Sequence, residues 1–341
     1  MKNFLKHILV PILVQPPISR FGAKLFGNTI PVFMLHRIQT GNHPYTGTTT
    51  EYLRRCLQYL VDNEYNFVSL EDIILASNGK KLLPANSVAF TMDDGYWDQA
   101  EIAAPIFIEF NCPATIFVIT GMLDGLLWPW DAKIAHLIDQ SKESTLKLTL
   151  SEKTYNLSIK SAKEKNTARE IIRNRIKELD GTDTDLYVNQ VSIAANVDIN
   201  IPAPNFRPMT WDNARQLEDK GIKFAPHSVT HRMLSKLDDE SSENEIIKSW
   251  QRLKEELSAP SPVFCYPTGR KCDYGNREVK FLIKNGLAGA VSTIPGHIAT
   301  HKLNTDYKYN IPRFALPANF EDFIQYCSWI ENMKNKFRPS Y

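Results

Sequence analysis

The sequence predicts an α/β protein whose central strands are parallel. Apolar runs at 88–90, 113–118 and 263–266 have the composition of strands that are buried on both faces, as in a parallel sheet. Helical patterns separate the runs, and a β-α-β succession implies parallel strands joined by right-handed crossovers. Polar residues follow several runs directly, and functional side chains sit at this position in barrels of parallel strands.

The elements can be assigned in chain order. The run 30–35 is the first expected strand, and Leu53, Leu57 and Leu60 fall at helical spacing in the segment after it. Further helices are expected at 97–110, 162–179, 209–220 and 238–257, and the last strands at 287–292 and 311–314.

Composition excludes some classes of protein. The chain has 341 residues, 43% of them hydrophobic and 23% charged, which is ordinary for a globular protein with a large core. A net charge of +2 gives no electrostatic argument for nucleic acid, so we expect no nucleic-acid partner. The five cysteines are odd in number and lack Cys-x-x-Cys spacing, which indicates neither a disulfide framework nor a zinc cluster and favours a reducing compartment.

Two adjacent carboxylates, Asp93 and Asp94, end the apolar strand that begins at Val88. Burying two acids there costs several kcal/mol unless a cation or hydrogen bonds compensate. Because side chains alternate along a strand, the two acids should point in different directions and have separate roles. The alternative is that Asp94-Gly95 closes a turn and Asp93 caps the following helix.

Two histidines follow another short apolar run, 221–224. His227 and His231 are four residues apart, so on a helical turn both imidazoles would lie on one face. Two histidines and one carboxylate make a three-ligand site with a position open for water, which is typical of catalytic rather than structural zinc.

Three segments together resemble the polysaccharide deacetylase family, also called NodB-homology proteins or carbohydrate esterase family 4. Residues 91–95 are similar to its Thr-Phe-Asp-Asp-Gly motif, with Met92 in place of Phe, and residues 227–231 match its His-Ser/Thr-x-x-His motif. Residues 266–269 resemble the Tyr-Pro-x-Gly variant of its third motif.

The resemblance covers about residues 30–120 and 205–320. It implies an irregular (β/α)7-type barrel with an α+β insertion, and an enzyme that removes N-acetyl or O-acetyl groups from the sugars of a glycan or polysaccharide. We therefore expect three parts. These are an N-terminal helical segment at 1–29, a catalytic domain at 30–330 interrupted at about 121–204, and a C-terminal tail at 331–341.

The resemblance and the required chemistry imply roles for single residues. Asp94, His227 and His231 are expected to bind a divalent metal, with Zn²⁺ the first choice, and Asp93 is expected to take a proton from water. An arginine such as Arg313 could orient Asp93 by a bidentate bond, or it could form a surface salt bridge.

Further roles concern the substrate. The backbone N–H of Tyr266 would stabilise the oxyanion while its ring, Trp97 and Pro267 line the substrate pocket.

His36 would protonate the leaving nitrogen, because Met34-Leu35-His36 resembles the Leu-x-His motif that some members carry at the start of the domain. His297 and His301 are the rivals for this role, and we interpret both as loop residues.

The insertion is expected to hold a β-hairpin, because 146–150 and 154–159 alternate apolar and polar residues around a polar turn. Trp128, Trp130 and Tyr187 could stack on sugar rings or could form the insertion's own core. We expect no catalytic residue in this segment.

The N-terminus has two interpretations. The apolar run 8–14 follows two lysines like a short signal peptide, but it is too short to span a bilayer and no Ala-x-Ala cleavage site follows. Residues 1–29 could form a membrane-surface helix or a helix docked on the barrel. We expect a cytoplasmic protein or one peripheral to the inner membrane, with the periplasm as an alternative, and the sequence carries no signal for an oligomeric state.

Two other functions stay open at this point. A glycoside hydrolase would need two acids at about 5–9.5 Å flanking a bond, which adjacent strand residues fit poorly. A non-catalytic carbohydrate-binding protein could use the same barrel, because a fold does not fix a function.

Overall fold

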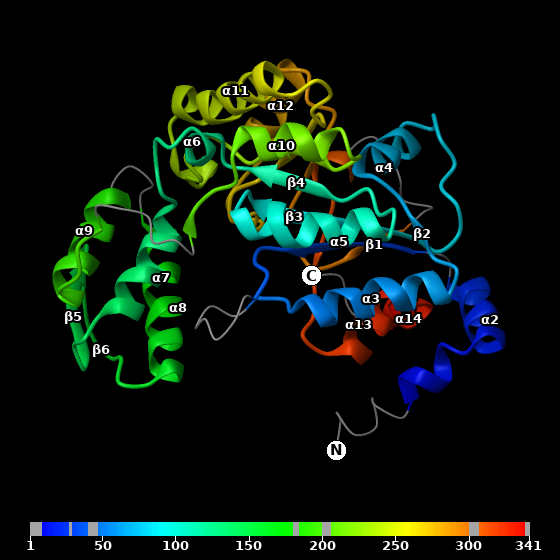
Figure 1. Ribbon diagram of the computed structural model, residues 1–341, viewed down its shortest axis with the longest axis horizontal. Helices are drawn as coiled ribbons and strands as arrows, with labels where there is room; N and C mark the ends of the chain where they lie inside the picture. Colours follow the sequence, from blue (N-terminus) through cyan, green and yellow to red (C-terminus); the bar gives the residue numbers. More distant parts are fainter. Residues whose placement is uncertain are drawn as a thin grey trace.

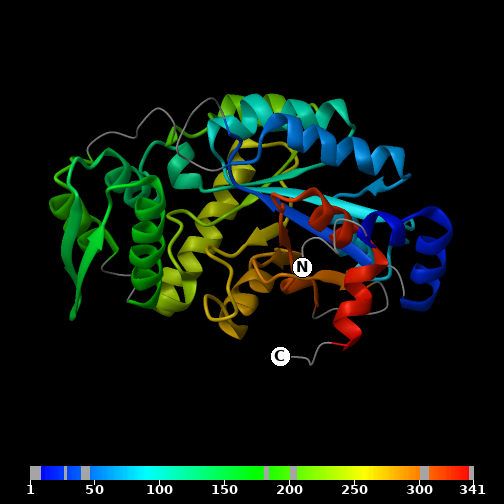
Figure 2. The ribbon, with the colours of Figure 1, turned by 90° about the horizontal axis from the view of Figure 1, so that it is seen from below.

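A central barrel carries a lobe at each end in the computed structural model (Figure 1). The structure describes residues 9–26, 29–39, 47–179, 184–199, 206–299 and 307–337. The insertion forms the lobe at one end, and the N-terminal and C-terminal helices lie together at the other (Figures 1 and 2).

The barrel consists of parallel strands in the expected order. β1 (Thr29–Leu35), β3 (Ser87–Asp94), β4 (Thr115–Val118) and β7 (Lys223–Pro226) pair in sequence. β8 (Val263–Cys265) pairs with β9 (Gly289–Val291), and β11 (Phe314–Ala315) returns to β1. These pairings confirm the (β/α)7-type barrel.

The barrel is irregular at two seams. Between β7 and β8 the backbone is linked by a hydrogen bond from Ser261 N to Phe224 O of 2.7 Å. Between β9 and β11 an isolated bridge joins Val291 and Ile311. Two short strands flank the barrel: β2 (Asn66–Phe67) pairs with β3, and β10 (His297–Ala299) pairs antiparallel with β1.

Helices cover the outside of the barrel. Side chains cap several of them; for example, Ser69 and Asp72 form a reciprocal capping box at the start of α4. The covering helices are α3 (Thr50–Asp62), α4 (Leu70–Ser77), η1 (Gln99–Ala103), α5 (Ala104–Glu109), α6 (Thr120–Leu123), α10 (Trp211–Glu218), η4 (Leu234–Lys236), α11 (Asp239–Glu256), α12 (Asn276–Lys284), η6 (Tyr307–Tyr309) and α13 (Phe320–Cys327).

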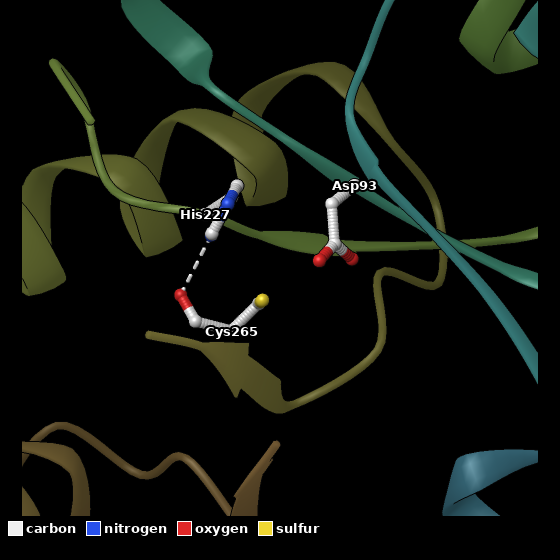
Figure 3. A group of neighbouring side chains, drawn as sticks. All are labelled: Asp93, His227 and Cys265. Carbon is white, nitrogen blue, oxygen red and sulfur yellow. Dashed lines mark hydrogen bonds between the residues drawn. The ribbon is translucent and has the colours of Figure 1, made fainter. Parts of the chain in front are cut away.

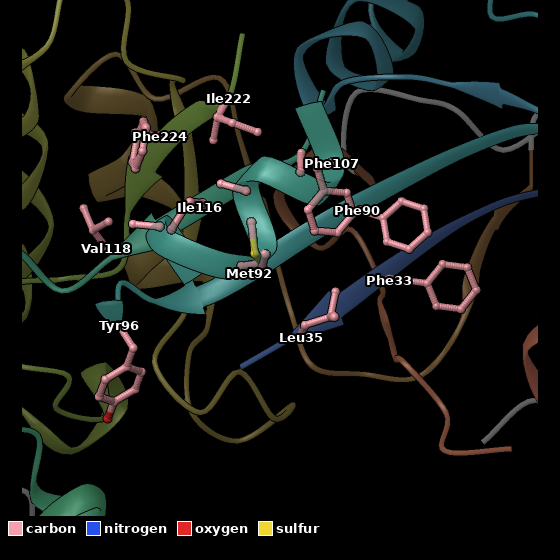
Figure 4. Close-up of a cluster of buried hydrophobic side chains, with 14 of the residues drawn as sticks. Phe33, Leu35, Phe90, Met92, Tyr96, Phe107, Ile116, Val118, Ile222 and Phe224 are labelled. Carbon is pink, nitrogen blue, oxygen red and sulfur yellow. The ribbon is translucent and has the colours of Figure 1, made fainter. Parts of the chain in front are cut away.

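Alternation along the strands divides the core into two layers. Phe33 of β1, Phe90 and Met92 of β3, and Phe224 of β7 point outward and pack under the helices (Figure 4). Residues of the opposite phase, such as Ala89, fill the barrel interior. Asp93 continues this inward phase at the end of β3, so the strand itself aims one carboxylate into the barrel.

The insertion has a hydrophobic core of its own. It contains α7 (Trp130–Gln140), β5 (Thr145–Leu150), β6 (Lys153–Ser158), α8 (Ala162–Glu178) and α9 (Thr184–Ala195). β5 and β6 form the expected hairpin. Trp130 and Tyr187 are buried in this core, so the insertion-core interpretation is confirmed for these two residues. Trp128 is instead buried in the barrel core.

The two ends of the chain pack together. α2 (Pro16–Phe26) lies against α14 (Trp329–Phe337), and the rings of Phe26 and Trp329 stack at 5.4 Å. The expected C-terminal tail is therefore helical as far as residue 337. The N-terminal segment is docked, and its outer face exposes Leu9, Ile12, Ile18, Phe21 and Leu25. No helix in the described ranges has the length and apolarity needed to cross a bilayer.

Because the insertion has its own core, we expect substitutions of a buried and an exposed isoleucine to differ in their effect on stability. Ile172 in α8 is fully buried, whereas Ile193 in α9 is 80% exposed. We expect Ile172→Ala to lower the free energy of unfolding by about 2–4 kcal/mol through the cavity it leaves. Ile193→Ala should change it by less than about 0.5 kcal/mol. Urea unfolding measures both, and equal losses would contradict the assignment of this core.

Candidate active site

Asp93 and Arg313 form an ion pair in the barrel interior. The two Nη atoms of Arg313 contact the two carboxylate oxygens of Asp93 at 2.7 Å each. Arg313 is fully buried, so the surface salt-bridge alternative is wrong. Burial opposes the charge on Asp93, but the guanidinium outweighs it and lowers the carboxyl pKa. Asp93 is therefore ionised at neutral pH.

The guanidinium of Arg313 uses all five of its N–H donors. Besides Asp93, it donates to Ser292 O at 3.0 Å, to Thr91 Oγ1 at 2.9 Å and to the Cys265 sulfur at 3.2 Å. These acceptors lie on or directly after β3, β8 and β9. The ion pair thus connects three strands and fixes the position of the Asp93 carboxylate.

Asp94 turns away from its neighbour. Its backbone has φ +87°, a left-handed value that L-residues rarely adopt, and this conformation directs the side chain towards the end of β7. One carboxylate oxygen lies 3.7 Å from Nε2 of His227 and 3.7 Å from Nε2 of His231. The two acids therefore have different partners, as alternation along the strand predicted.

The two histidines lie on an irregular turn rather than a helix, so the expectation of a helical turn is wrong. Ser228 and His231 have φ +65° and +60°, and the reversal brings the two imidazole centroids to 4.8 Å. Glu245 of α11 holds the turn by accepting from the amides of Val229 and Thr230 at 2.9 and 2.8 Å. A helix cannot supply these left-handed conformations.

Figure 3 shows a second group that combines ligand atoms, formed by Asp93, His227 and Cys265. In this group Arg313 already holds both oxygens of Asp93 and donates to the sulfur of Cys265. Burial also raises the pKa of the Cys265 thiol, which disfavours the thiolate that binds metal. The Asp93 group is therefore the poorer cation site.

The residues Asp94, His227 and His231 fit a divalent cation. Their ligand atoms all lie within 4.8 Å of one another. Two ligands on a tetrahedral zinc lie about 3.4 Å apart, close to the 3.7 Å between Asp94 and each histidine. Asp94 accepts no hydrogen bond from the described residues, and burial together with Asp131 and Asp93 raises its carboxyl pKa. A cation would stabilise the ionised carboxylate.

The histidines are also prepared as ligands. Nδ1 of His227 lies 2.8 Å from the carbonyl oxygen of Cys265, which directs Nε2 at Asp94. Burial lowers the pKa of His227 to about 3 and also lowers that of His231, so both are neutral, which is the form that binds metal. Nδ1 of His231 is buried without a hydrogen-bond partner and lies 3.9 Å from Asp131.

His36 lies at the end of β1, on the same cavity. Its Nε2 is 3.8 Å from Asp93, and its side chain is half-exposed. Protein atoms around the inner half of the ring exclude water and lower its pKa, and the charge of Asp93 opposes that shift. His297, the rival in the described chain, lies in β10 and is buried beside Asn332, so its interpretation as a loop residue is wrong. His301 lies outside the described residues.

Two functional residues, Asp98 and Gln99, follow the paired acids in the chain and were missed by the sequence analysis. The side-chain amide of Gln99 donates to the carbonyl oxygens of Asp93 and His36, the latter at 2.7 Å. Asp98 accepts from Ile38 N at 2.7 Å and pairs with Arg37 at 3.1 Å. Gln99 begins the π-helical turn η1, an irregularity common at functional sites. Its side chain joins the ends of β1 and β3.

Tyr266 does not offer the amide that the sequence analysis assigned to it. Its N–H donates to Val291 O at 3.3 Å, within the pairing of β8 and β9, so the expected oxyanion role is wrong. Its ring stacks on Tyr274 at 3.7 Å. Tyr266 lines the cavity, but Trp97 and Pro267 do not, and Trp97 lies under the guanidinium of Arg207.

These groups surround a cavity of about 100 Å³. It is lined by His36, Asp93, Asp94, Asp131, Arg173, Lys177, His227, His231, Tyr266, Thr268 and Thr293. Three of these residues, Asp131, Arg173 and Lys177, come from the insertion. The insertion therefore lines the cavity, and the expectation that it holds no catalytic residue stays a prediction. A larger cavity of about 570 Å³ borders the first at His36.

Comparison with known proteins gives the family. The family model for polysaccharide deacetylase matches residues 80–287, more than half of the chain. YxkH of Bacillus subtilis (strain 168), named as a polysaccharide deacetylase, is 29% identical over 90 residues, which are 26% of this chain. That match spans only about a third, 32%, of the length of YxkH.

Solved structures share the fold. The deacetylase PplD of Streptococcus pyogenes, solved in complex with acetate, has a TM-score of 0.57 at 17% identity and covers 91% of this chain and 99% of PplD. IcaB of Ammonifex degensii has a TM-score of 0.56 at 14% identity, and the match covers 89% of this chain and 98% of IcaB. The family model includes β3, β7 and β8 with the paired acids and histidines. This chain therefore belongs to the polysaccharide deacetylase family.

Proposed function

We propose that this protein hydrolyses N-acetyl groups on the sugars of a glycan or polysaccharide, with a divalent cation held by Asp94, His227 and His231. One observation carries the proposal. Neighbouring carboxylates open on one cavity, but Asp94 faces two imidazoles and Asp93 faces a guanidinium. This division provides a cation ligand and a separate base within one small space.

The size of the cavity supports an acetyl group as the reacting part. A cavity of about 100 Å³ is several times larger than a single water molecule needs, so it has room for an acetyl group. The sugar would lie in the larger cavity beyond His36. PplD, which shares the fold, was solved with acetate, the product that deacetylation releases.

Asp93 is our candidate for the general base. Arg313 keeps its carboxylate ionised and fixes both oxygens, while lone pairs on the cavity side stay available. In this position Asp93 takes a proton from the water that attacks the acetyl carbon. When bound, a divalent cation supplies Lewis-acid chemistry, polarising the acetyl carbonyl and acidifying the water.

A backbone donor for the developing oxyanion is also needed. Thr268 lines the cavity in a left-handed conformation, φ +56°, and its amide has no acceptor among the described residues. Since the Tyr266 amide is used in the sheet, Thr268 N–H is our candidate for this role. His36, when protonated, then gives its proton to the nitrogen as the C–N bond breaks, which leaves acetate and a free amine, and the proton that Asp93 took from water can restore His36.

Removing a ligand should remove the cation. We expect His227→Ala and Asp94→Ala to lose bound Zn²⁺ together with acetate release, because two remaining ligands hold the ion poorly. Elemental analysis after dialysis measures the metal, and His297→Ala is the matched control because His297 is buried away from the cavity. A full complement of metal in His227→Ala would contradict the ligand assignment.

Replacing the base should separate metal binding from turnover. Asp93→Asn keeps the size of the side chain, so the variant should retain its metal while kcat falls by about 10²–10⁴. Arg313 loses its charged partner in this variant, and circular dichroism at the assay temperature checks that it is folded. If Asp93→Asn kept most of its kcat, Asp93 would not be the base.

The role of His36 depends on the leaving group. An amide nitrogen needs a proton when the C–N bond breaks, whereas an activated phenol leaves without one. We therefore expect His36→Ala to lower kcat by about 10²-fold on an acetamido sugar and much less on 4-nitrophenyl acetate. Equal losses on both substrates would argue against proton donation by His36.

A further inference from the structure

Helix α8 of the insertion closes one side of the catalytic cavity. Figure 1 shows α8 on the side of the insertion lobe that faces the barrel. Arg173 and Lys177, one helical turn apart on α8, both line the cavity, and Asp131 from the start of α7 lies beside them. None of the strand ends or barrel loops provides these groups.

The acids around this part of the cavity are already paired. Asp131 accepts from Nη2 of Arg173 at 3.0 Å, and Asp273 binds Arg270 at 2.8 Å. Asp93 is held by Arg313. The remaining acid, Asp94, belongs to the cation site described above.

The two cations on α8 keep unused donors. Nε of Arg173 is buried without an acceptor, although 40% of the whole side chain is exposed. Lys177 has neither an ion pair nor a hydrogen bond to its ammonium group within the described ranges. Both residues line the cavity, and a buried donor without an acceptor requires an explanation such as a bound ligand.

Two cations lie together on this helix face. Like charges four residues apart on a helix repel each other, and burial together with Arg173 lowers the pKa of Lys177, a shift that Asp131 and Asp273 oppose. An anion bound between the two side chains would remove this repulsion and satisfy the unused donors.

We propose that Arg173 and Lys177 form a subsite for an anionic group of the substrate, a phosphate or a carboxylate carried next to the acetylated sugar. Arg173 offers the free edge of its guanidinium, and Lys177 offers its ammonium group. The subsite rests on the proposed deacetylase function, since it assigns the charge of that enzyme's substrate. The insertion then selects the glycan while the barrel performs the hydrolysis.

Three matched substrates test the subsite on the full-length, metal-loaded protein. They are a neutral chitooligosaccharide, the same oligosaccharide with a 6-phosphate on one residue, and the same with its C6 oxidised to a carboxylate. We expect kcat/KM for acetate release to be at least about 10-fold higher for one charged substrate than for the neutral one, the value of a charged hydrogen bond. The preferred charged substrate identifies the anion.

Substitutions in α8 test whether this helix causes the preference for a charged substrate. Lys177→Met should lower the charged-to-neutral ratio of kcat/KM about 10-fold, and Lys177→Arg should retain it. Lys163→Met removes an equal charge from the exposed start of α8 and should leave the ratio unchanged. A wild-type ratio near one for both charged substrates, or an unchanged ratio in Lys177→Met, would overturn the proposal.

A binding measurement distinguishes failure of the subsite proposal from failure of the deacetylase proposal. Isothermal titration of the three oligosaccharides into wild-type and Lys177→Met protein requires no turnover. If wild-type protein released no acetate but bound a charged oligosaccharide about 10-fold more tightly than the neutral one, the deacetylase proposal would fail and the subsite would stand. Equal affinities for all three would remove the subsite.

Discussion

The arrangement of this molecule depends on a guanidinium enclosed in a barrel. Arg313 is fully buried, and its five donors reach acceptors on or beside β3, β8 and β9. Removing one member of such a buried pair leaves an uncompensated charge at a cost of about 3–5 kcal/mol. The same ion pair therefore keeps Asp93 charged for its chemistry and connects the strands.

A single backbone conformation gives the two acids their separate environments. β3 directs Asp93 inward by its alternation, and the left-handed conformation of Asp94 turns the next carboxylate towards the histidines. Gln99 fixes this strand end to that of β1 and so places His36 on the same cavity. Asp94, His231 and Thr268, all in left-handed conformations, line the cavity, where strain can serve a function.

The insertion changes what the barrel can recognise. Its hydrophobic core is separate from the barrel core, so its sequence can vary without disturbing the strands. Through α7 and α8 it brings one acid and two cations to a cavity whose remaining lining comes from the barrel. Chemistry and selectivity are thus divided between two separately packed parts of one chain, and we place the charge selectivity on α8.

The sequence by itself determined the parallel strands, the paired acids and the paired histidines, because strand alternation and residue type are local properties. The barrel followed from the family resemblance that these motifs carry. The same resemblance also indicated His36 and Arg313. Only the tertiary structure decided that Tyr266 uses its amide within the sheet, that the histidines lie on a left-handed turn, and that α8 reaches the cavity. Each of these depends on a partner remote in the chain, and neither periodicity nor spacing records which remote segments meet.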